Sequence, residues 1–454
     1  MRITVIGTGY LGAVHAACLA ELGFEVLGVD SDPAKVAALQ IGQPPFFEPG
    51  LADLLTRVLA TGRLRFTTSL PEAAEFGDVH FICVGTPQMP GSNAADLTQV
   101  TGAIAALTPL LTRPCLVIGK STVPVGTASN IAELLTAAPA GAGVELAWNP
   151  EFLREGFAIE DTLSPDRLVF GIRSAQAELT LRSIYADAIQ AGAPVVVTDF
   201  PTAELVKVAA NAFLATKISF INAMAEVCEA TGADVTELAD ALGHDPRIGR
   251  RFLNAGLGFG GGCLPKDIRA FMARADELGV PEALEFLREV DSINLRRRDR
   301  TVAAARELAG GTLVDVKVAC LGASFKPDSD DVRDSPALHV AQALHAEGAL
   351  VRVTDPKSIT NATDRYPHLS YVASPEAALA GADLTLLLTE WREYCEIDPA
   401  AARPLVAKAI MLDGRNALDP QAWRSAGWVY RGIGRREQLA ITSDGYFVLV
   451  RSNT

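Results

Sequence analysis

The feature that most constrains this chain is its opening stretch, MRITVIGTGYLGAVHAACLAELGFEVLGVDSD. An apolar strand over residues 3–6 leads into G-x-G-x-x-G, a small-residue helix follows over 13–22, and a second strand over 25–29 ends at Asp30. Strand, glycine turn, helix, strand and terminal acid within about 30 residues predict a βαβ unit that binds a dinucleotide. A glycine-rich turn without a nucleotide is the alternative, and the complete context disfavours it.

Each part of this unit has a physical task. Gly7 makes the tight turn, Gly9 lets a pyrophosphate approach, and Gly12 allows the helix to pack closely. The helix N-terminus then faces the negative charge of the ligand. Asp30 is expected to hold a ribose 2′-hydroxyl and to repel a 2′-phosphate, which favours NAD over NADP, although Lys35 could weaken that preference.

Composition sets limits on the class of protein. The 454 residues, 49% hydrophobic and 21% charged, predict a globular chain of two or three domains. A net charge of −14 argues against a nucleic-acid partner. Seven cysteines without a C-x-x-C pair fit neither a disulfide framework nor a metal site, and indicate a reducing, cytoplasmic location. No apolar run is expected to reach the roughly 20 residues of a membrane span, and no signal peptide precedes the first strand.

Strands and helices alternate after the opening unit, which predicts a doubly wound parallel sheet. Thr86 and Thr122 follow two of the predicted strands, where such sheets bind ligands, but both threonines could equally cap helices. Glu151 and Glu155 leave the next strand on a loop, a placement more typical of a site than of a solvated face. The predicted strands of this region cover residues 64–67, 79–84, 115–119, 146–148, 168–171 and 195–198.

One uninterrupted helix is predicted over residues 202–231, long enough to join two domains. Lys207 and Asn211 are four residues apart and share one face of it. Lys207 lies in an apolar stretch, where desolvation would lower its pKa and suit it to acid/base or oxyanion work. Further helices over 235–242, 266–278 and 281–308 complete a helical centre that could bury a dimer interface, and the arginines over 296–300 are expected to face solvent.

A glycine-rich loop within residues 244–269 carries Cys263, followed by Lys266 and Asp267. Five glycines let its backbone lie against a ligand. A nearby ammonium favours the thiolate, and a nearby carboxylate can handle a proton or a water, so Cys263 is a candidate nucleophile. The alternative is a small apolar filler, which is what most buried cysteines are.

The tail from about residue 314 again alternates strands and helices, but without G-x-G-x-x-G. Lys326, Arg333 and Arg415 occupy predicted strand-exit loops, where they could grip a phosphate-bearing ligand or be ordinary surface charges. The sequence thus predicts an α/β fold with a Rossmann-type doubly wound domain over 1–198, a central helical domain with a long connecting helix over 199–310, and a Rossmann-like α/β domain over 311–454.

A series of longer motifs carries a family resemblance: GTGYLG, VGTP, KSTVPVGT, NPEFLREG, KVAANAFLATKISFIN, DPRIG, GFGGGCLPKD, GASFKPDSDDVRDSP and DGRN. In this order they resemble the UDP-glucose/GDP-mannose dehydrogenase family over nearly the whole chain. DPRIG and GFGGGCLPKD resemble the branch that acts on UDP-glucose rather than the N-acetylmannosamine branch. Two departures are Gly262, where a serine is common, and a loop over 90–96 that is longer than usual.

The resemblance implies an NAD-dependent, two-step, four-electron oxidation of a nucleotide-sugar C6 alcohol to a uronate. It implies that a cysteine carries the intermediate as a thiohemiacetal and then a thioester. The catalytic residues implied are Cys263, Lys207, Asn211, Asp267, Glu151 and Thr122. The domain over 311–454 is implied to bind the nucleotide sugar, and the chain to form a homodimer or higher homo-oligomer. The resemblance names no metal.

Residue by residue, the motifs place two groups of ligand contacts. The expected cofactor-binding residues are Gly7, Gly9, Tyr10, Leu11, Gly12, Asp30, Lys35, Thr86, Thr122, Glu155, Lys266 and Arg333. The expected substrate-binding residues are Phe152, Leu153, Arg154, Glu155, Lys207, Asn211, Arg247 (from a partner subunit), Phe252, Asn254, Gly256, Gly258, Phe259, Gly260, Lys326 and Arg415.

Three other functions stay open at this point. The same chemistry could act on GDP-mannose or a UDP-N-acetylhexosamine. A simple two-electron alcohol or hydroxy-acid dehydrogenase would share the first domain but have no use for Cys263. A non-catalytic NAD-binding protein would have lost the nucleophile or the lysine, and this sequence keeps both.

Overall fold

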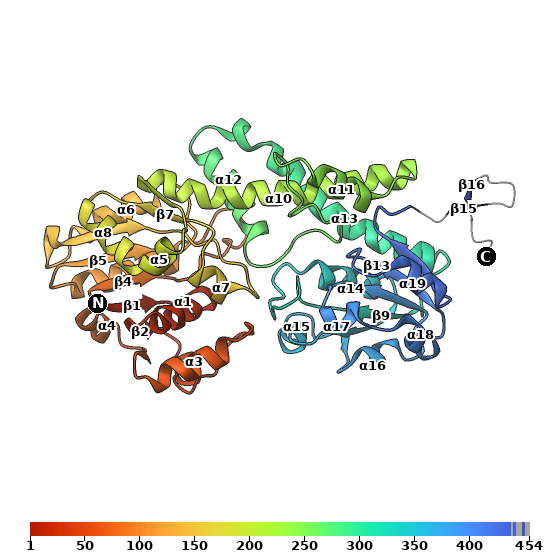
Figure 1. Cartoon of the computed structure of the whole chain (residues 1–454), viewed down its shortest axis with the longest axis horizontal. Helices are drawn as coiled ribbons and strands as arrows, with labels where there is room; N and C mark the ends of the chain where they lie inside the picture. Colours follow the sequence, from red (N-terminus) through yellow and green to blue (C-terminus); the bar gives the residue numbers. More distant parts are fainter. Residues whose placement is uncertain (437–438, 442–446, 450–454) are drawn as a thin grey trace. The chain divides into compact units, whose positions relative to one another are not determined.

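The computed structural model describes residues 1–436, 439–441 and 447–449 (Figure 1). The chain forms two compact units, one of residues 1–211 with 266–284 and one of residues 212–265 with 285–454. Helices α10 (Phe200–Thr231) and α12 (Leu264–Glu277) pass from one unit to the other. The predicted domain over 311–454 includes residues 437–438, 442–446 and 450–454, which lie outside the described residues, and the three-domain division stays a prediction.

The first unit is built on an eight-stranded sheet in the order β3-β2-β1-β4-β5-β6-β7-β8. All neighbours pair in parallel except β6 and β7, which are antiparallel. The doubly wound sheet that the sequence predicted is confirmed, with this one reversed pairing added. Its strands are β1 Arg2–Ile6, β2 Glu25–Val29, β3 Leu64–Thr67, β4 Val79–Ile82, β5 Cys115–Gly119, β6 Val144–Trp148, β7 Leu168–Gly171 and β8 Val195–Thr198.

Helices cover both faces of this sheet because alternate strand residues enter two separate cores. In β5, Leu116 and Ile118 pack in one core, whereas Val117 packs in the other. The helices of this unit, besides parts of α10 and α12, are α1 Tyr10–Glu21, α2 Pro33–Gln40, α3 Leu51–Ala60, α4 Leu70–Phe76, α5 Thr98–Leu107, α6 Thr127–Leu135, α7 Ala158–Leu163, α8 Ala175–Ile184 and α9 Ala186–Gln190.

The second unit holds an all-parallel six-stranded sheet in the order β11-β10-β9-β12-β13-β14. Its strands are β9 Lys317–Leu321, β10 Leu350–Thr354, β11 Ser370–Tyr371, β12 Leu384–Leu387, β13 Ile410–Asp413 and β14 Val429–Gly432, and β15 Leu439–Ile441 and β16 Phe447–Leu449 pair separately. Its helices, besides parts of α10 and α12, are α11 Val235–Gly243, α13 Phe286–Leu308, α14 Pro336–Ala346, α15 Ile359–Arg365, α16 Pro375–Leu379, α17 Arg392–Cys395, α18 Pro399–Ala402 and α19 Pro420–Ser425.

Helix α10 confirms the predicted long helix and begins two residues earlier, at Phe200. Among the described helices it is the one long and apolar enough to cross a membrane by length and composition, although Lys207, Lys217 and Glu226 interrupt its apolar runs. Its buried polar side chains, however, bind other segments of this chain: Glu204, Asn211 and Asn222 all do so. That is the behaviour of a helix packed inside a protein.

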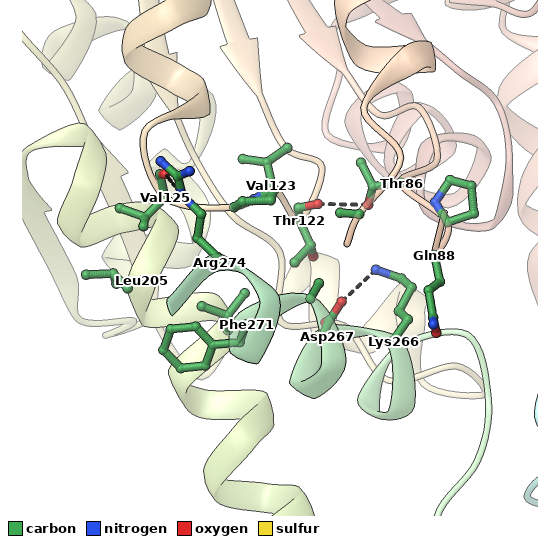
Figure 2. A pocket seen from close by; sticks show the side chains of 15 residues that line it. Thr86, Gln88, Thr122, Val123, Val125, Leu205, Lys266, Asp267, Phe271 and Arg274 are labelled. Carbon is green, nitrogen blue, oxygen red and sulfur yellow. Dashed lines mark hydrogen bonds and ion pairs between the residues drawn. The ribbon is translucent and has the colours of Figure 1, made fainter. Parts of the chain in front are cut away.

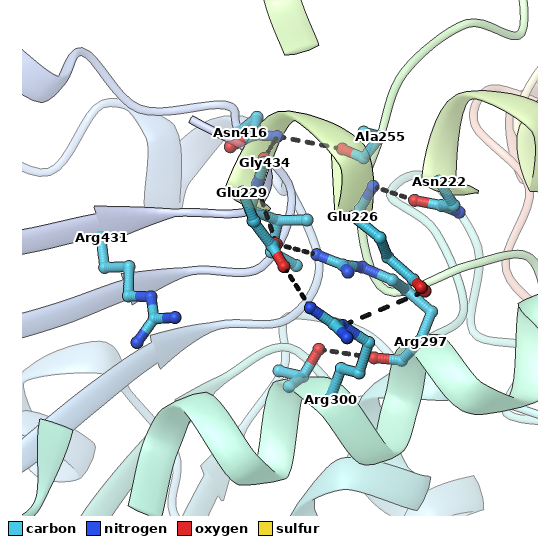
Figure 3. A network of polar contacts seen from close by, with 12 residues as sticks. Asn222, Glu226, Glu229, Ala255, Arg297, Arg300, Asn416, Arg431 and Gly434 are labelled. Carbon is cyan, nitrogen blue, oxygen red and sulfur yellow. Dashed lines mark hydrogen bonds and ion pairs between the residues drawn. The ribbon is translucent and has the colours of Figure 1, made fainter. Parts of the chain in front are cut away.

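The arginines of α13 correct another expectation (Figure 3). Arg297 and Arg298 are each only 2% exposed, whereas a fully solvated row was predicted. Arg297 donates to Glu229 of α10 at 2.8 Å, and Arg300 donates to the second oxygen of the same carboxylate at 2.6 Å. The prediction failed because the carboxylate that allows burial comes from a helix about 70 positions away in the chain. The predicted helix over 281–308 is also interrupted, since α13 begins only at Phe286.

Candidate active site

The turn between β1 and α1 has the geometry expected of a dinucleotide site. Gly7 has φ +90°, which favours glycine, and a Cβ on Gly12 would lie 1.8 Å from the carbonyl oxygen of Gly7. Only glycine therefore fits at position 12. Gly9 is different, because a Cβ there would meet no protein atom within 4 Å. The space beside Gly9 is available to a ligand, and α1 begins at the next residue, Tyr10.

Asp30 lies at the end of β2 and reaches back to this turn. Its carboxylate accepts from the backbone N–H of Thr8 at 2.9 Å and from the Thr8 hydroxyl at 3.0 Å. Lys35 Nζ lies 3.1 Å from the same oxygen. Burial raises the pKa of Asp30, but the amides of Asp32 and Thr8 and the charge of Lys35 outweigh it and hold the pKa below its usual value. The carboxylate is thus charged, and Lys35 sits where it can moderate that charge.

The Lys207 side chain is buried as predicted, but it is paired. Its Nζ lies 2.9 Å from Glu151 Oε1, and the two side chains are 5% and 12% exposed. Burial raises the pKa of Glu151, yet the charge and hydrogen bond of Lys207, the amide of Leu153 and the charge of Lys120 together lower it. The pair joins α10 to the loop that follows β6.

Asn211, one helical turn further along α10, donates to Asp267 at 2.6 Å. Asp267 is 3% exposed and stands in the first turn of α12, where Lys266 Nζ lies 2.6 Å from its other oxygen. Four of the predicted catalytic residues, Lys207, Asn211, Glu151 and Asp267, therefore form two buried pairs on one face of α10. An acid, an amide and an amine held in this way can bind a water and move its protons.

Thr86 and Thr122 lie together beside these pairs and line one pocket (Figure 2). The Thr86 hydroxyl donates to the carbonyl oxygen of Thr122 at 2.8 Å. Neither threonine caps a helix, because α5 and α6 have Leu97 and Gly126 at their N-caps, so the capping alternative is wrong. The lining is Thr86, Pro87, Gln88, Ala95, Thr122, Val123, Pro124, Val125, Leu205, Val208, Lys266, Asp267, Ala270, Phe271 and Arg274.

The residues expected to bind substrate over 152–155 lie on the loop after Glu151. Phe152 lies under the guanidinium of Arg167, 3.8 Å from ring centre to Cζ, and Arg154 is engaged by Asp161 at 2.5 Å. The far end of this loop is held by Glu48, whose carboxylate accepts from the amides of Gly156 and Ala158, each at 2.7 Å. Glu48 also receives the hydroxyl of Tyr10, which belongs to the dinucleotide turn.

Cys263 belongs to the second unit and is exposed. Other parts of the protein, and not open space, lie where the side chains of the preceding glycines would be. A Cβ on Gly258 would lie 2.2 Å from Asn294 Oδ1, and one on Gly262 would lie 2.2 Å from the guanidinium carbon of Arg333. The departure at Gly262 therefore lets Arg333 lie against the residue before Cys263. Asp331 fixes that guanidinium, with Nη2 and Oδ2 2.7 Å apart.

The expected substrate residues of the second unit fall into two groups. Arg415 donates to the carbonyl oxygens of Phe325, beside Lys326, and Gly258, at 3.1 and 3.4 Å, and so joins loops that the sequence had singled out separately. Arg247, by contrast, is 87% exposed and pairs with Asp245. Of the remaining expected residues, Phe259 is buried, Asn254 accepts from Arg250, Phe252 has φ +66°, and Gly256 and Gly260 approach the backbones of Gly414 and Asp334.

Sequence reasoning missed several buried charged groups that support these residues. Lys120 donates to Asn149 at 3.0 Å and to the Tyr185 hydroxyl at 3.2 Å, directly before the Glu151 loop. Burial lowers the pKa of Lys120 to about 8. Glu48 and Glu204 each bind backbone amides at the start of a helix. The signal that could have found them is an acid or a lysine within an apolar stretch, since such groups are buried only when paired.

The first unit has the glycine turn, the strand-end acid and the doubly wound sheet of an NAD-dependent dehydrogenase. The family comparison agrees, because residues 1–189, 201–296 and 319–420 match the NAD binding, central and UDP binding domains of the UDP-glucose/GDP-mannose dehydrogenase family. The chain belongs to this family, and the resemblance seen in its motifs is confirmed.

Individual relatives cover nearly the whole chain. A UDP-glucose 6-dehydrogenase of Pseudomonas aeruginosa is 40% identical over 445 residues, covering 96% of this chain and 98% of its own. One of Rhizobium meliloti is 41% identical over 438 residues, with 96% and 100% covered. Among solved structures, a UDP-glucose dehydrogenase from the archaeon Pyrobaculum islandicum aligns with TM-score 0.88 at 38% identity, covering 96% of this chain and 98% of that one.

Proposed function

We propose that this chain oxidises UDP-glucose to UDP-glucuronate, using two NAD molecules in turn and releasing two NADH and three protons per sugar with the uptake of one water. The UDP-glucose 6-dehydrogenases at 39–41% identity support this substrate. The single observation that carries the chemistry is the pair of buried contacts on one face of α10, Lys207 with Glu151 and Asn211 with Asp267.

The residues of the first unit fit NAD. Gly9 leaves open space directly before the N-terminus of α1, where a pyrophosphate is favoured. Asp30 offers a charged carboxylate to ribose hydroxyls. When bound, NAD supplies the hydride acceptor for both oxidations. The remaining cofactor contacts that we propose are Tyr10, Leu11, Lys35, Thr86, Thr122, Glu155, Lys266 and Arg333.

In the first oxidation the C6 hydroxyl must lose a proton while the carbon loses a hydride. A base, helped by Lys207 or by a water bound to Asp267, takes that proton. Lys207 is buried against Glu151, and Asp267 is fixed by Asn211 and Lys266. The product of this step is an aldehyde.

In the second oxidation the Cys263 thiolate adds to the aldehyde carbon to form a thiohemiacetal, whose alkoxide oxygen is stabilised by Lys207 and Asn211. Loss of a hydride from this alkoxide gives the thioester, the Cys263 thiol having lost its proton before the addition. A water oriented by Asp267, Glu151 and Thr122 then cleaves the C–S bond, which releases the carboxylate and restores the thiol. Burial raises the pKa of Cys18, Cys83 and Cys320 to about 12, which makes those thiols unsuited to this role.

The proposed contacts of the nucleotide sugar come from several loops of the chain. Arg415 and Lys326 are the basic groups for the diphosphate, because Arg415 already ties the 256–260 loop to Phe325. Arg247 reaches the sugar of a second copy, in keeping with its 87% exposure. The other contacts proposed are Phe152, Leu153, Arg154, Glu155, Phe252, Asn254, Gly256, Gly258, Phe259 and Gly260.

The chain acts as a homodimer or higher oligomer in the cytoplasm. Phe213, Phe220 and Val227 recur every seven residues along the second-unit part of α10 and are 68%, 46% and 52% exposed. An apolar stripe of this spacing is typical of a helix that pairs with another.

We also propose a separate role for each of three domains. Residues 1–198 bind the cofactor, residues 199–310 form the dimer and carry part of the catalytic site, and residues 311–454 bind the nucleotide sugar.

Counting NADH per sugar tests the function. We expect two NADH per UDP-glucose and much slower turnover with GDP-mannose and UDP-N-acetyl sugars. One NADH per sugar would indicate a simple two-electron dehydrogenase, and faster turnover of another nucleotide sugar would reassign the substrate. Cys263→Ser should stop after at most the first oxidation, with Cys228→Ser as the matched control. Uronate formed at the wild-type rate by Cys263→Ser would refute the covalent step.

A further inference from the structure

Helix α10 carries three buried polar residues on one face, Glu204, Lys207 and Asn211, at positions i, i+3 and i+7. They are 1%, 4% and 7% exposed. Lys207 and Asn211 bind Glu151 and Asp267, which the proposed function uses. Glu204 is the third member of this row, and its partner is neither a side chain of that site nor solvent.

Both carboxylate oxygens of Glu204 are bound to backbone at the start of α6. Oε2 accepts from the N–H of Gly126 at 2.8 Å, and Oε1 accepts from the N–H of Ala128 at 2.6 Å. Gly126, the N-cap of α6, has no side chain with which to cap the helix. Other helices of this unit use a local residue instead, as α8 does with Ser174. The cap of α6 thus comes from a different helix. Unlike a capping residue within the same segment, Glu204 also links α6 to α10.

The residues just before this cap form one wall of the pocket in Figure 2. This wall is the segment Thr122, Val123, Pro124 and Val125. Arg274 of α12 donates its Nε to the carbonyl oxygen of Val125 at 3.0 Å. The neighbouring peptide groups of Val125 and Gly126 are therefore held by opposite charges from two helices. Those helices, α10 and α12, also carry Lys207 and Asp267, so the wall is fixed to the elements that carry the proposed catalytic groups.

We propose that Glu204 is a positioning residue for the cofactor: it holds the Thr122–Val125 wall at the distance from α10 that lets the pocket accept the nicotinamide end of NAD. This inference deepens the proposed function and rests on it. The face of a planar ring such as nicotinamide can pack against this wall, because Val123, Val125, Val208, Leu205 and Phe271 line the pocket. Glu204 itself does not line the pocket and acts only through the backbone that it binds.

Glu204→Gln tests this with little change in size. The amide nitrogen cannot accept a hydrogen bond, so one of the two backbone N–H groups loses its acceptor and the charge at the start of α6 is lost. We expect the Kd and KM for NAD to rise about tenfold, the scale of one lost charge-assisted hydrogen bond, while kcat at saturating NAD stays within about twofold. Glu204→Asp, whose shorter side chain reaches fewer of these amides, should give an intermediate rise.

Leu135→Ala is the matched control, because Leu135 is buried at the opposite end of the same helix and lines none of the pockets described. It should lower the Tm at least as much as Glu204→Gln and leave the Kd for NAD unchanged. An unchanged Kd in Glu204→Gln, or an equal rise in Leu135→Ala, would reduce Glu204 to a helix cap and overturn the proposal. If Glu204→Gln does not fold, Arg274→Gln tests the same wall from its other side, with the same expected rise.

Calorimetric titration of NAD into sugar-free protein separates this test from that of the proposed function. Wild-type protein that binds NAD but oxidises no nucleotide sugar would refute the proposed function and leave the Glu204 comparison readable from the Kd values alone. Wild-type protein that makes two NADH per UDP-glucose, with Glu204→Gln binding NAD normally, would refute only the positioning role.

Discussion

The two sheets of this chain repeat the same local design at their second strands, and differ in what surrounds it. In the first sheet, Asp30 at the end of β2 accepts from the amide and hydroxyl of Thr8 in the β1 turn. In the second, Asp355 at the end of β10 accepts from the amide and hydroxyl of Ser324, just after β9. Gly7 and Gly322 open the two turns with φ +90° and +114°.

The two turns differ in where the following helix begins and in how many hydrogen bonds the aspartate already accepts. In the first sheet α1 begins at Tyr10, immediately after the turn, whereas in the second α14 begins only at Pro336. The Asp355 carboxylate is 4% exposed and also receives the indole N–H of Trp391 and the amides of Ala323, Lys357 and Ser358. The second turn therefore has neither a helix N-terminus nor an available acid for a dinucleotide. Shared topology does not by itself create the site.

The largest difference between the two sheets is expected when Asp355 and Asp30 are each replaced by alanine. Asp355→Ala leaves buried N–H groups without an acceptor, so we expect it to destabilise the second unit by roughly 4 kcal/mol or more. Asp30→Ala should cost less stability, because Asp30 has fewer donors, but should raise the KM for NAD about tenfold or more and the sugar KM little. Calorimetric unfolding and steady-state kinetics of both variants check this. Equal losses of stability, or equal changes in both KM values for Asp30→Ala, would contradict the assignment.

The matched glycines give the next largest effect. Gly9→Ala meets no protein atom within 4 Å and its φ of −69° suits alanine, so its Tm should stay at the wild-type value. Its Kd for NAD should nevertheless rise at least about tenfold, since the methyl group enters the ligand's space. Gly322→Ala would place a Cβ 2.4 Å from Thr389 Cβ at a φ of +114°, and should lower the Tm. Normal NAD binding by a folded Gly9→Ala protein would show that the cofactor does not bind beside Gly9.

The pKa values of two carboxylates at the ends of strands should be shifted in opposite directions. Burial raises the pKa of both Glu151 and Asp413, but Lys207 with its neighbours reverses the shift at Glu151, whereas the amide of Leu418 and the hydroxyl of Tyr430 do not reverse it at Asp413. Glu151 thus stabilises the fold above its unfolded pKa and loses this as pH falls through the folded value. Asp413 favours the fold below its unfolded pKa and loses this as pH rises through its folded value.

Carboxylate NMR titration measures these shifts directly. Glu151 should titrate below the usual value of 4.5 and Asp413 above 3.8. Lys207→Met removes the largest opposing influence, so the pKa of Glu151 should then move upward, while that of Asp413 stays where it is. An unmoved Glu151 in Lys207→Met would show that the ion pair does not set its charge.

The smallest effect is expected at Lys35, whose Nζ pairs with Asp30 at 28% side-chain exposure. A partly solvated pair of this kind contributes about 0–1 kcal/mol. Lys35→Met should therefore change the KM for NAD less than about fivefold and make NADP a poorer cofactor, because Asp30 repels the 2′-phosphate without a compensating cation. Improved use of NADP by this variant would reverse the role given to Lys35.

Local signals predicted the elements well where strands and turns are short and strongly patterned. The strands over 115–119, 168–171 and 195–198 lie where the apolar runs placed them, and α10 differs from its prediction only at its start. The errors came from long-range contacts. Arg297 is buried because Glu229 of another helix pairs with it, and β7 runs antiparallel to β6 although the alternation of strands and helices predicted a parallel sheet.

The site divides in the same way. The glycine turn, Asp30, Lys207 and the Asn211 spacing were readable, since each depends on residues close together in the chain. Glu204 and Glu48 were not, because their partners, the amides at the start of α6 and α7, are 76 and 110 positions away. A buried carboxylate in an apolar helix signals that some partner exists, but not which one.

By itself, then, the sequence determined the family, the two α/β sheets and the glycine turn that fits NAD, because these follow from local propensity and from motifs of contiguous residues. Only the tertiary structure decided that Lys207 is an ion pair rather than a lone amine, that the second sheet's acid is fully bonded, and that Glu204 caps a helix it does not adjoin. The physical reason is that burying a charge requires a partner, and the fold, not the order of residues, supplies it.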